Sequence, residues 1–267
     1  PREQPLPLRM PPSPTFTVNS GDGGWGTGRA GMLYRDLLPD RAGGALIASH
    51  IRIPTGGPVP DYTHFHRITF QLIYVLRGWV EVVYEGQGPP FRMGPGDFVT
   101  QPPTIRHQVL SCSDGLEVLE IGLPAEHATI ADHSFELPDE STLKSAKFGG
   151  QVFVRHIAEE HETEAVVEHG VAWRETAVAE STGGLASVRI GQMLDTAAAT
   201  AAPLVSHDDA IALGFVLDGA ATLEVEEEGQ QFELSQDSFV CTPPGVRCRY
   251  AAASDDLRLL DIRVREM

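Results

Sequence analysis

The chain has 267 residues with a formal net charge of −17, and 42% of them are apolar, so one large or two small domains with packed cores are feasible. The acidic balance argues against nucleic acid and anionic membranes as partners, because phosphate-rich surfaces need a basic partner face. No apolar run approaches the roughly 18 residues of a membrane span. Three cysteines without CxxC spacing indicate no disulfide framework, which favours a reducing, cytoplasmic location.

The chain begins with a proline-rich stretch, and we expect residues 1–42 to form an extended N-terminal arm, since the apolar core of a signal peptide is missing. Residues 43–125 consist of short apolar runs separated by turns. "GGALIASHIRIP" predicts one strand, "FQLIYVLRGWVEVVYEG" two strands divided at Gly78, "PFRMGPGDFVTQPP" two more, and "RHQVLSCSDGLEVLEIGLP" a hairpin that turns at residues 113–115. Turn signals at intervals of about 8–12 residues are typical of a sandwich or barrel.

The next stretch, residues 126–183, is more polar and contains the acidic segment "HIAEEHETEAVVEHG". We expect a linker with some local structure, and we assign its histidines to the surface (His156, His161 and His169). Strand-like runs return in residues 184–267, for example in "GFVLDGAATLEVEEEGQQFELSQDSFVCTPPG". The sequence therefore predicts a mostly β protein with two strand-rich regions around a polar connection.

The two strand-rich regions are copies of one module. When the chain is aligned with itself at an offset of 141 residues, identical residues coincide without a gap between His66 and Cys248. The matched pairs are His66 and His207, Gly78 and Gly219, Gly88 and Gly229, Phe91 and Phe232, Phe98 and Phe239, Val99 and Val240, Pro102 and Pro243, Pro103 and Pro244, and Arg106 and Arg247. So many matches at one offset indicate an internal duplication.

Four polar residues of the first copy form a candidate metal site. His64 and His66 point to the same side of a strand because side chains alternate. Gln71 follows five residues later, and His107 stands where the chain re-enters a strand after two prolines. Imidazole nitrogen suits a divalent first-row metal. The alternative is that the histidines only form hydrogen bonds inside a barrel, but the HxH order with a third histidine favours a metal.

These residues resemble the two motifs of the cupin superfamily. The first motif is matched by His64, His66, Gln71 and Gly78, with glutamine where the family has glutamate, and its leading glycine has no clean match. The second is matched by Gly96, Pro102 and His107, with Thr104 in place of glycine and Ser111 in place of asparagine. The resemblance covers both copies and implies an all-β protein of two tandem cupin (double-stranded β-helix, jelly-roll) barrels. It also implies that His64, His66, Gln71 and His107 are the metal ligands.

Gln71 leaves two arrangements open. An amide oxygen brings no charge, so as a fourth ligand it would leave the metal its full charge and favour anionic ligands. Otherwise Gln71 does not bind, and three histidines hold the metal, as in gentisate-like and β-diketone-cleaving dioxygenases among the cupins that the chain resembles. By that resemblance, Fe(II) is the expected metal, with Zn, Ni and Mn as alternatives.

The second copy lacks these ligands. At the same offset Val205, Ala212 and Cys248 replace His64, Gln71 and His107, and only His207 remains. We expect no metal in this barrel and a structural role for it. The alternatives are a lid or a dimerisation partner, and a homodimer is possible.

A largely apolar barrel interior suits a small aromatic or alkyl substrate. The candidate pocket residues, chosen by strand alternation around the ligands, are Tyr62, Ile73, Val75, Gln101, Ile105 and Val109. No general base is identified. The sequence thus predicts a non-haem Fe(II) dioxygenase that acts on a small aromatic or diketone-like substrate. The alternatives are a non-oxidative, metal-dependent isomerase or lyase, and a cupin that binds a small ligand without turnover.

Overall fold

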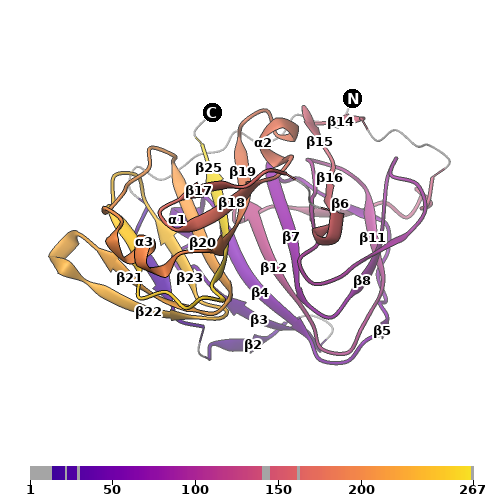
Figure 1. Ribbon diagram of the computed structural model, residues 1–267. Coiled ribbons are helices and arrows are strands. Elements are labelled where there is room, and N and C mark those ends of the chain that lie inside the picture. Colours follow the sequence, from indigo (N-terminus) through magenta and orange to yellow (C-terminus); the bar gives the residue numbers. More distant parts are fainter. Residues whose placement is uncertain (1–13, 22, 29–30, 140–144, 161–162, 266–267) are drawn as a thin grey trace. The chain divides into compact units, whose positions relative to one another are not determined.

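The computed structural model describes residues 14–21, 23–28, 31–139, 145–160 and 163–265. The chain is almost entirely β and forms two compact units, each built mainly from antiparallel sheets (Figure 1). The first unit consists mainly of Gly24–His161, and the second mainly of Gly184–Met267 with Glu162–Glu180 and strand β1 (Thr17–Asn19). In the described ranges, no helix is both long and apolar enough to cross a membrane.

The first unit is built from two antiparallel sheets. One has the order β16-β10-β7-β12-β4-β3-β2, and the other has the order β13-β6-β11-β8-β9, with β5 beside β11. The strands are β2 (Trp25–Thr27), β3 (Leu33–Asp36), β4 (Ile47–Ile53), β5 (Gly57–Pro58), β6 (His64–His66), β7 (Phe70–Arg77), β8 (Val80–Tyr84), β9 (Phe91–Met93), β10 (Phe98–Thr100), β11 (His107–Cys112), β12 (Leu116–Leu123), β13 (Thr129–Ala131) and β16 (Val154–His156). Also present are the short pair β14 (Lys147–Phe148) and β15 (Gln151–Val152), helix α1 (Arg41–Gly44) and the 3-10 turn η2 (Ala158–Glu160).

Apolar side chains hold the first barrel together. Strand β7 reads "FQLIYVLR" and lies between β10 and β12, so β-branched and aromatic residues occupy a central, two-sided position. The buried cluster includes Val75, Tyr84, Val99 and Ile105, contributed by both sheets and by the loop before β11. This cluster forms the wall behind the candidate site.

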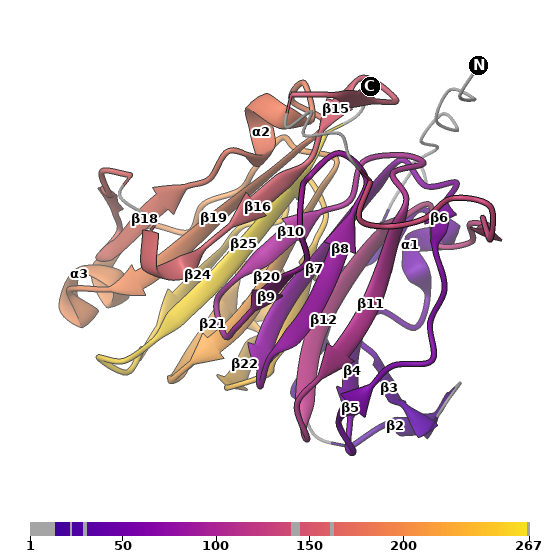
Figure 2. The same cartoon turned by 90° about the vertical axis from the view of Figure 1, so that its right-hand side faces the viewer.

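A turn at Gly78 carries the chain from one sheet of the first unit to the other. Its φ of +74° is a left-handed conformation that favours glycine. A Cβ at this position would also collide with the Ser113 hydroxyl and crowd the backbone of Leu116. Glycine therefore lets β7 and β8 belong to different sheets: β7 pairs with β10 and β12, whereas β8 pairs with β11, beside which it lies in Figure 2.

The hairpin predicted around residues 113–115 is wrong. Strand β11 pairs with β5, β6 and β8 in one sheet, whereas β12 pairs with β4 and β7 in the other. Both strands have apolar inner faces, which are buried across the barrel when the turn at Gly115 joins the two sheets. Sequence adjacency suggested a hairpin, but burial of these faces favours the jelly-roll connection.

The arm and the linker expected from the sequence contain more regular structure than expected. Residues 1–13 of the arm lie outside the described residues, but β1 pairs with β23, and β2 and β3 extend the sheet beside β4. In residues 126–183, β13 pairs with β6 and β16 pairs with β10. His156, assigned to the surface, is instead buried and stacks on Phe98 with ring centroids 4.5 Å apart. His169 is exposed, and His161 lies outside the described residues.

The second unit repeats this plan with a seven-stranded sheet, β1-β23-β20-β25-β19-β18-β17, and a three-stranded sheet, β22-β21-β24. Its other strands are β17 (Val166–Glu168), β18 (Val171–Glu175), β19 (Ala186–Met193), β20 (Ile211–Asp218), β21 (Ala220–Val225), β22 (Gln231–Ser235), β23 (Phe239–Thr242), β24 (Cys248–Ala251) and β25 (Arg258–Val264), with α2 (Val178–Ser181), α3 (Thr196–Ala201) and η3 (Glu227–Gly229). The repeat extends to strand register, since Ala212 pairs with Arg263 as Gln71 pairs with Gly122.

A buried carboxylate ties together three strands of the first unit. Glu117 on β12 accepts hydrogen bonds from His50 Nε2 at 2.6 Å, Arg52 Nε at 2.9 Å and Arg77 Nη1 at 2.7 Å. Burial by itself would raise the pKa of Glu117, but the bonds from His50 and Arg52 and the charge of Arg77 outweigh burial and hold this pKa at about 2. Glu117 is therefore ionised at neutral pH and stabilises the folded unit.

Candidate metal centre

Three histidines meet where β6 and β11 pair at one end of the first barrel. His64 lies directly opposite His107 in this pairing, and His66 is two residues further along β6. The ring centroids are 4.3 Å apart for His64 and His107, 5.1 Å for His66 and His107, and 5.2 Å for His64 and His66. One ring nitrogen from each can be chosen so that all three lie within 4.8 Å of one another. The sequence-predicted histidines are thus brought together.

Hydrogen bonds at Nδ1 orient the three imidazoles. His64 Nδ1 donates to the Tyr62 carbonyl at 2.8 Å, and His107 Nδ1 donates to the Ile105 carbonyl at 3.1 Å. Because a carbonyl only accepts, these two bonds leave Nε2 of each ring with its lone pair. His66 Nδ1 lies 2.9 Å from the Thr129 hydroxyl, which is able to accept in the same way. Such outer partners are typical of metal-binding histidines.

The protonation state of His107 also suits metal binding. Burial, together with the neighbouring charge of His64, lowers the pKa of His107 to about 3, although the bond to the Ile105 carbonyl acts in the opposite direction. The imidazole is therefore neutral at pH 7, which is the form that coordinates a metal.

Gln71 has one satisfied and one unsatisfied amide atom. Its Nε2 donates to the Glu120 carboxylate on β12 at 2.7 Å, which fixes the orientation of the amide. Its Oε1 is buried and has no hydrogen-bond partner among the described residues. An unsatisfied buried acceptor costs about 1–3 kcal/mol, a cost that a bound cation or a substrate donor would remove. The three imidazoles therefore fit a divalent metal, and this amide oxygen is a buried donor, without a partner among the described residues, that a cation would satisfy.

The pocket residues predicted from the sequence divide into polar and apolar members. Tyr62 is 46% exposed, and its ring lies 5.9 Å from that of His64. Gln101 is buried, donates to the Tyr84 hydroxyl at 2.6 Å, and leaves its own Oε1 without a partner in the described ranges. The four apolar candidates belong to or pack against the buried cluster of the barrel: Ile73, Val75, Ile105 and Val109.

Sequence reasoning missed several neighbours of the site. His127 lies 5.5 Å from His66 between ring centroids, and its Nδ1 donates to the Pro124 carbonyl. His133 lies 5.0 Å from the ring of Tyr62, and the ring of Tyr84 stacks on His107 at 5.4 Å. His127, His133 and Thr129 come from the segment expected to be a linker. One signal in the sequence could have revealed these neighbours: several histidines follow directly after the last predicted strand of the first barrel.

The family model of the cupin domain matches residues 49–121 and 193–263, which together make up more than half of the chain. The chain belongs to the cupin family. The two matched regions coincide with the two barrels, in agreement with the bicupin resemblance seen in the sequence. A search of the curated proteins gave no match.

Several solved structures share the fold at low sequence identity. Salicylate 1,2-dioxygenase from Pseudaminobacter salicylatoxidans is 15% identical with a TM-score of 0.64, covering 96% of this chain and 86% of that chain. Protein Ylba from E. coli is 11% identical with a TM-score of 0.62, covering 94% and 91%. Oxalate decarboxylase from Bacillus subtilis, which has Mn(II) centres, is 15% identical with a TM-score of 0.57, covering 88% and 73%. These likenesses support only the fold of this cupin. The sequence identity is too low to transfer an activity from the similar proteins.

Proposed function

We propose that this cupin binds one divalent transition metal in its first barrel and is a non-haem Fe(II) dioxygenase of a small aromatic or diketone-like substrate. The observation that carries the proposal is the convergence of His64, His66 and His107 with hydrogen bonds at Nδ1 that orient them. Nε2 of each histidine would hold the metal, and Gln71 Oε1 would supply a fourth, uncharged ligand. A ferrous ion held there would supply activation of dioxygen next to a bound substrate.

The ligand set favours anionic substrates. Three neutral imidazoles and an amide contribute no formal charge, so the metal keeps its attraction for a phenolate, enolate or carboxylate. The Glu120 carboxylate is separated from the site by the Gln71 amide, and its hydrogen bond polarises that amide and makes Oε1 a better donor to a cation. The Gln71 oxygen is thus a stronger donor to a metal than an ordinary amide oxygen, but it adds no formal charge.

We assign two side chains near the histidines to the orientation of a substrate. The unsatisfied Gln101 Oε1 accepts a hydrogen bond from a substrate hydroxyl. The exposed ring of Tyr62, beside His64 and His133, contacts the substrate at the mouth of the barrel. The apolar cluster behind them excludes water from the metal side of the substrate.

A second candidate function is a metal-dependent lyase, because the similar structures include a decarboxylase with Mn(II) centres as well as a dioxygenase. The same residues would then hold a metal that acts as a Lewis acid. Consumption of dioxygen separates the two functions, since only the oxygenase requires it.

The test combines metal analysis with oxygen uptake. We expect about one metal ion per chain, and oxygen uptake by iron-loaded protein with at least one member of a panel of gentisate-like phenols, catechols, salicylates and β-diketones. His66→Ala should lose the metal, whereas His207→Ala, the matched residue of the second barrel, should retain it. Iron-loaded protein that consumes no oxygen across the panel, but still carries metal, would contradict the dioxygenase and leave the lyase.

A further inference from the structure

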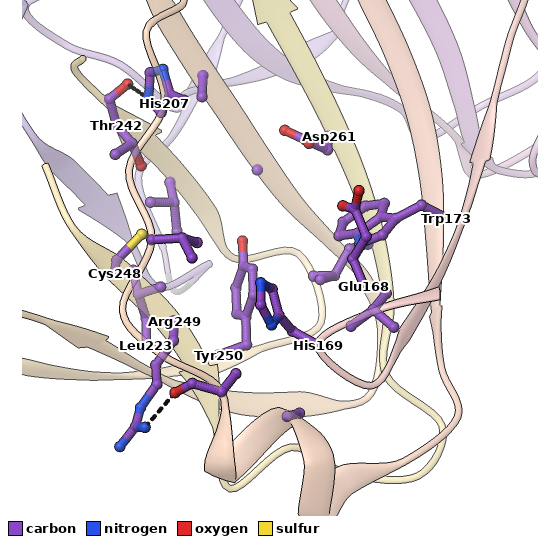
Figure 3. Close-up of a pocket in the computed structure, with 18 of the residues that line it drawn as sticks. Glu168, His169, Trp173, His207, Leu223, Thr242, Cys248, Arg249, Tyr250 and Asp261 are labelled. Atoms are coloured by element: carbon purple, nitrogen blue, oxygen red, sulfur yellow. Dashed lines mark hydrogen bonds between the residues drawn. The ribbon is translucent and has the colours of Figure 1, made fainter. Parts of the chain in front are cut away.

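The second barrel contains a cavity of about 380 Å³ where the first barrel has its histidine cluster (Figure 3). All four residues that correspond to the candidate ligands line it, namely Val205, His207, Ala212 and Cys248. Replacement of Gln71 by alanine and of two histidines by valine and cysteine removes both ligand atoms and side-chain volume. The cavity volume falls in the range of small-molecule pockets.

Part of the wall of this cavity is apolar. Leu223 and Val240 line it from β21 and β23, and the indole of Trp173 lines it from β18. Trp173 is held on one face by the Arg189 guanidinium, whose central carbon lies 4.1 Å from the ring centroid. The ring also lies so close to Gly191 that a Cβ there would collide with it. The apolar wall is therefore preformed.

The charged groups of the cavity are already paired with one another. Asp261 accepts from Arg189 Nε at 2.6 Å and from Arg263 Nε at 2.8 Å. Arg189 also bonds Glu168 at 3.1 Å, and Arg249 donates to Glu224 at 2.6 Å. A charged ligand would have to break one of these pairs, so the site favours an uncharged one.

Nδ1 of His207 is buried in this cavity without a partner among the described residues, and a second polar group available to a ligand is Tyr250. Its ring stands inside the cavity in Figure 3, and no hydrogen bond to its hydroxyl is found within the described ranges. The matching position of the first barrel is Val109, and the buried tyrosine of that barrel, Tyr84, already accepts a hydrogen bond from Gln101 at its hydroxyl. Gly214 makes room for the Tyr250 hydroxyl, since a Cβ there would lie 2.9 Å from it. Burial raises the pKa of Tyr250, so the hydroxyl stays protonated and donates.

We propose that the second barrel is a binding site for an uncharged small molecule with an aromatic or branched apolar body and one carbonyl group. The body packs against Trp173, Leu223 and Val240, and the carbonyl accepts a hydrogen bond from the Tyr250 hydroxyl. This site is separate from the metal centre of the first barrel and requires no metal.

The experiment uses two fluorinated probes with the full-length chain. The first is 4-fluoroacetophenone, and the second is 1-ethyl-4-fluorobenzene, which keeps the fluorophenyl body and the two-carbon side chain but lacks the carbonyl oxygen. Binding is followed by fluorine NMR for the wild type, Tyr250→Phe and Ala212→Leu, with thermal unfolding to verify that each variant is folded. Metal content is measured in parallel, so that this proposal and the metal site of the first barrel are judged separately.

The wild type should bind the ketone. In Tyr250→Phe, the ratio of ketone to ethyl affinity should fall roughly fivefold, which corresponds to one lost hydrogen bond. Ala212→Leu should abolish binding of both probes, because its larger side chain fills the cavity. No binding by the wild type, an unchanged affinity ratio in Tyr250→Phe, or undiminished binding in folded Ala212→Leu would each overturn the proposal.

Discussion

The hydrogen bond between Gln71 and Glu120 allows the role of Gln71 to be tested by a charge swap. Gln71→Glu alone replaces an amide that donates at 2.7 Å by a second carboxylate in the same place. The lost bond to a charged acceptor is worth about 1.5–3 kcal/mol, and two like charges about 3 Å apart repel by about 5 kcal/mol at an effective dielectric constant of about 20. Glu120 is only partly buried and is able to turn towards solvent. We therefore expect metal-free Gln71→Glu to lose roughly 3 kcal/mol of unfolding free energy.

The double variant Gln71→Glu, Glu120→Gln should recover most of this loss, because the amide and the carboxylate then exchange places and the bond is restored. If Gln71 Oε1 is a ligand, the double variant should also bind metal at least tenfold more tightly, since a charged ligand replaces a neutral one. Chemical denaturation in the presence of a chelator measures the first effect, and calorimetric metal titration measures the second. Metal-free Gln71→Glu as stable as the wild type would refute the contribution of this contact to stability. A double variant with unchanged metal affinity would show that three histidines alone hold the metal.

Three further predictions follow from local geometry. Thr104 has a φ of +65° and a buried hydroxyl without a partner among the described residues. Thr104→Gly should therefore raise the free energy of unfolding, measured with denaturant, by about 1 kcal/mol. A loss of stability in this variant would contradict the prediction. Thr129→Val removes the outer partner of His66 and should weaken metal binding about tenfold by calorimetry, whereas equal affinity would show that this bond is irrelevant. Glu117→Gln should cost up to about 3 kcal/mol near pH 7, because the Glu117 pKa is held at about 2. The contribution is complete above the usual carboxyl pKa of 4.5 and is lost as the pH falls towards 2, so the two proteins should converge in stability at low pH; a difference independent of pH would refute the assignment.

Much of the fold could be predicted because the repeat and the strand pattern agree. Alternation placed His64 and His66 on one side, and the offset of 141 residues reproduces strand register, as the equivalent pairs of Gln71 and Ala212 show. What alternation cannot give is which strands become neighbours. The segment at residues 113–115 has the composition of a hairpin turn, and only burial of both inner faces decides that it joins two sheets.

The environment of the candidate site was harder to predict for a related reason. Glu120 contacts Gln71 from another strand 49 residues away, and nothing local distinguishes it from a solvent-facing residue of β12. His127 and Thr129 lie in a polar stretch whose composition indicates a linker. Their place beside His66 follows from a three-residue strand, β13, which is too short to have a recognisable pattern. The residues that surround the candidate metal site are therefore decided by long-range strand pairing, which local sequence patterns do not reveal.

The two barrels differ most in the use of one acidic residue. Glu120 and Asp261 occupy matching registers on β12 and β25, opposite Ile73 and Gly214. In the first barrel this acid accepts a hydrogen bond from the Gln71 amide, whereas in the second it accepts from two arginines. One of these is Arg263, which stands where the first barrel has Gly122 and brings a positive charge into the cavity.

The arginine has consequences for any attempt to convert the second barrel into a metal site. Burial lowers the pKa of His207, and the charge of Arg263 lowers it further, so the guanidinium acts on the position that matches His66. A metal ion there would meet the same charge. Restoring histidines at Val205 and Cys248 and glutamine at Ala212 would therefore be insufficient while Arg263 remains. Loss of the ligands and gain of the arginine together disfavour a metal ion in the second barrel, and the pairing of Arg263 with Asp261 favours an uncharged occupant, while the first barrel retains histidines suited to a cation.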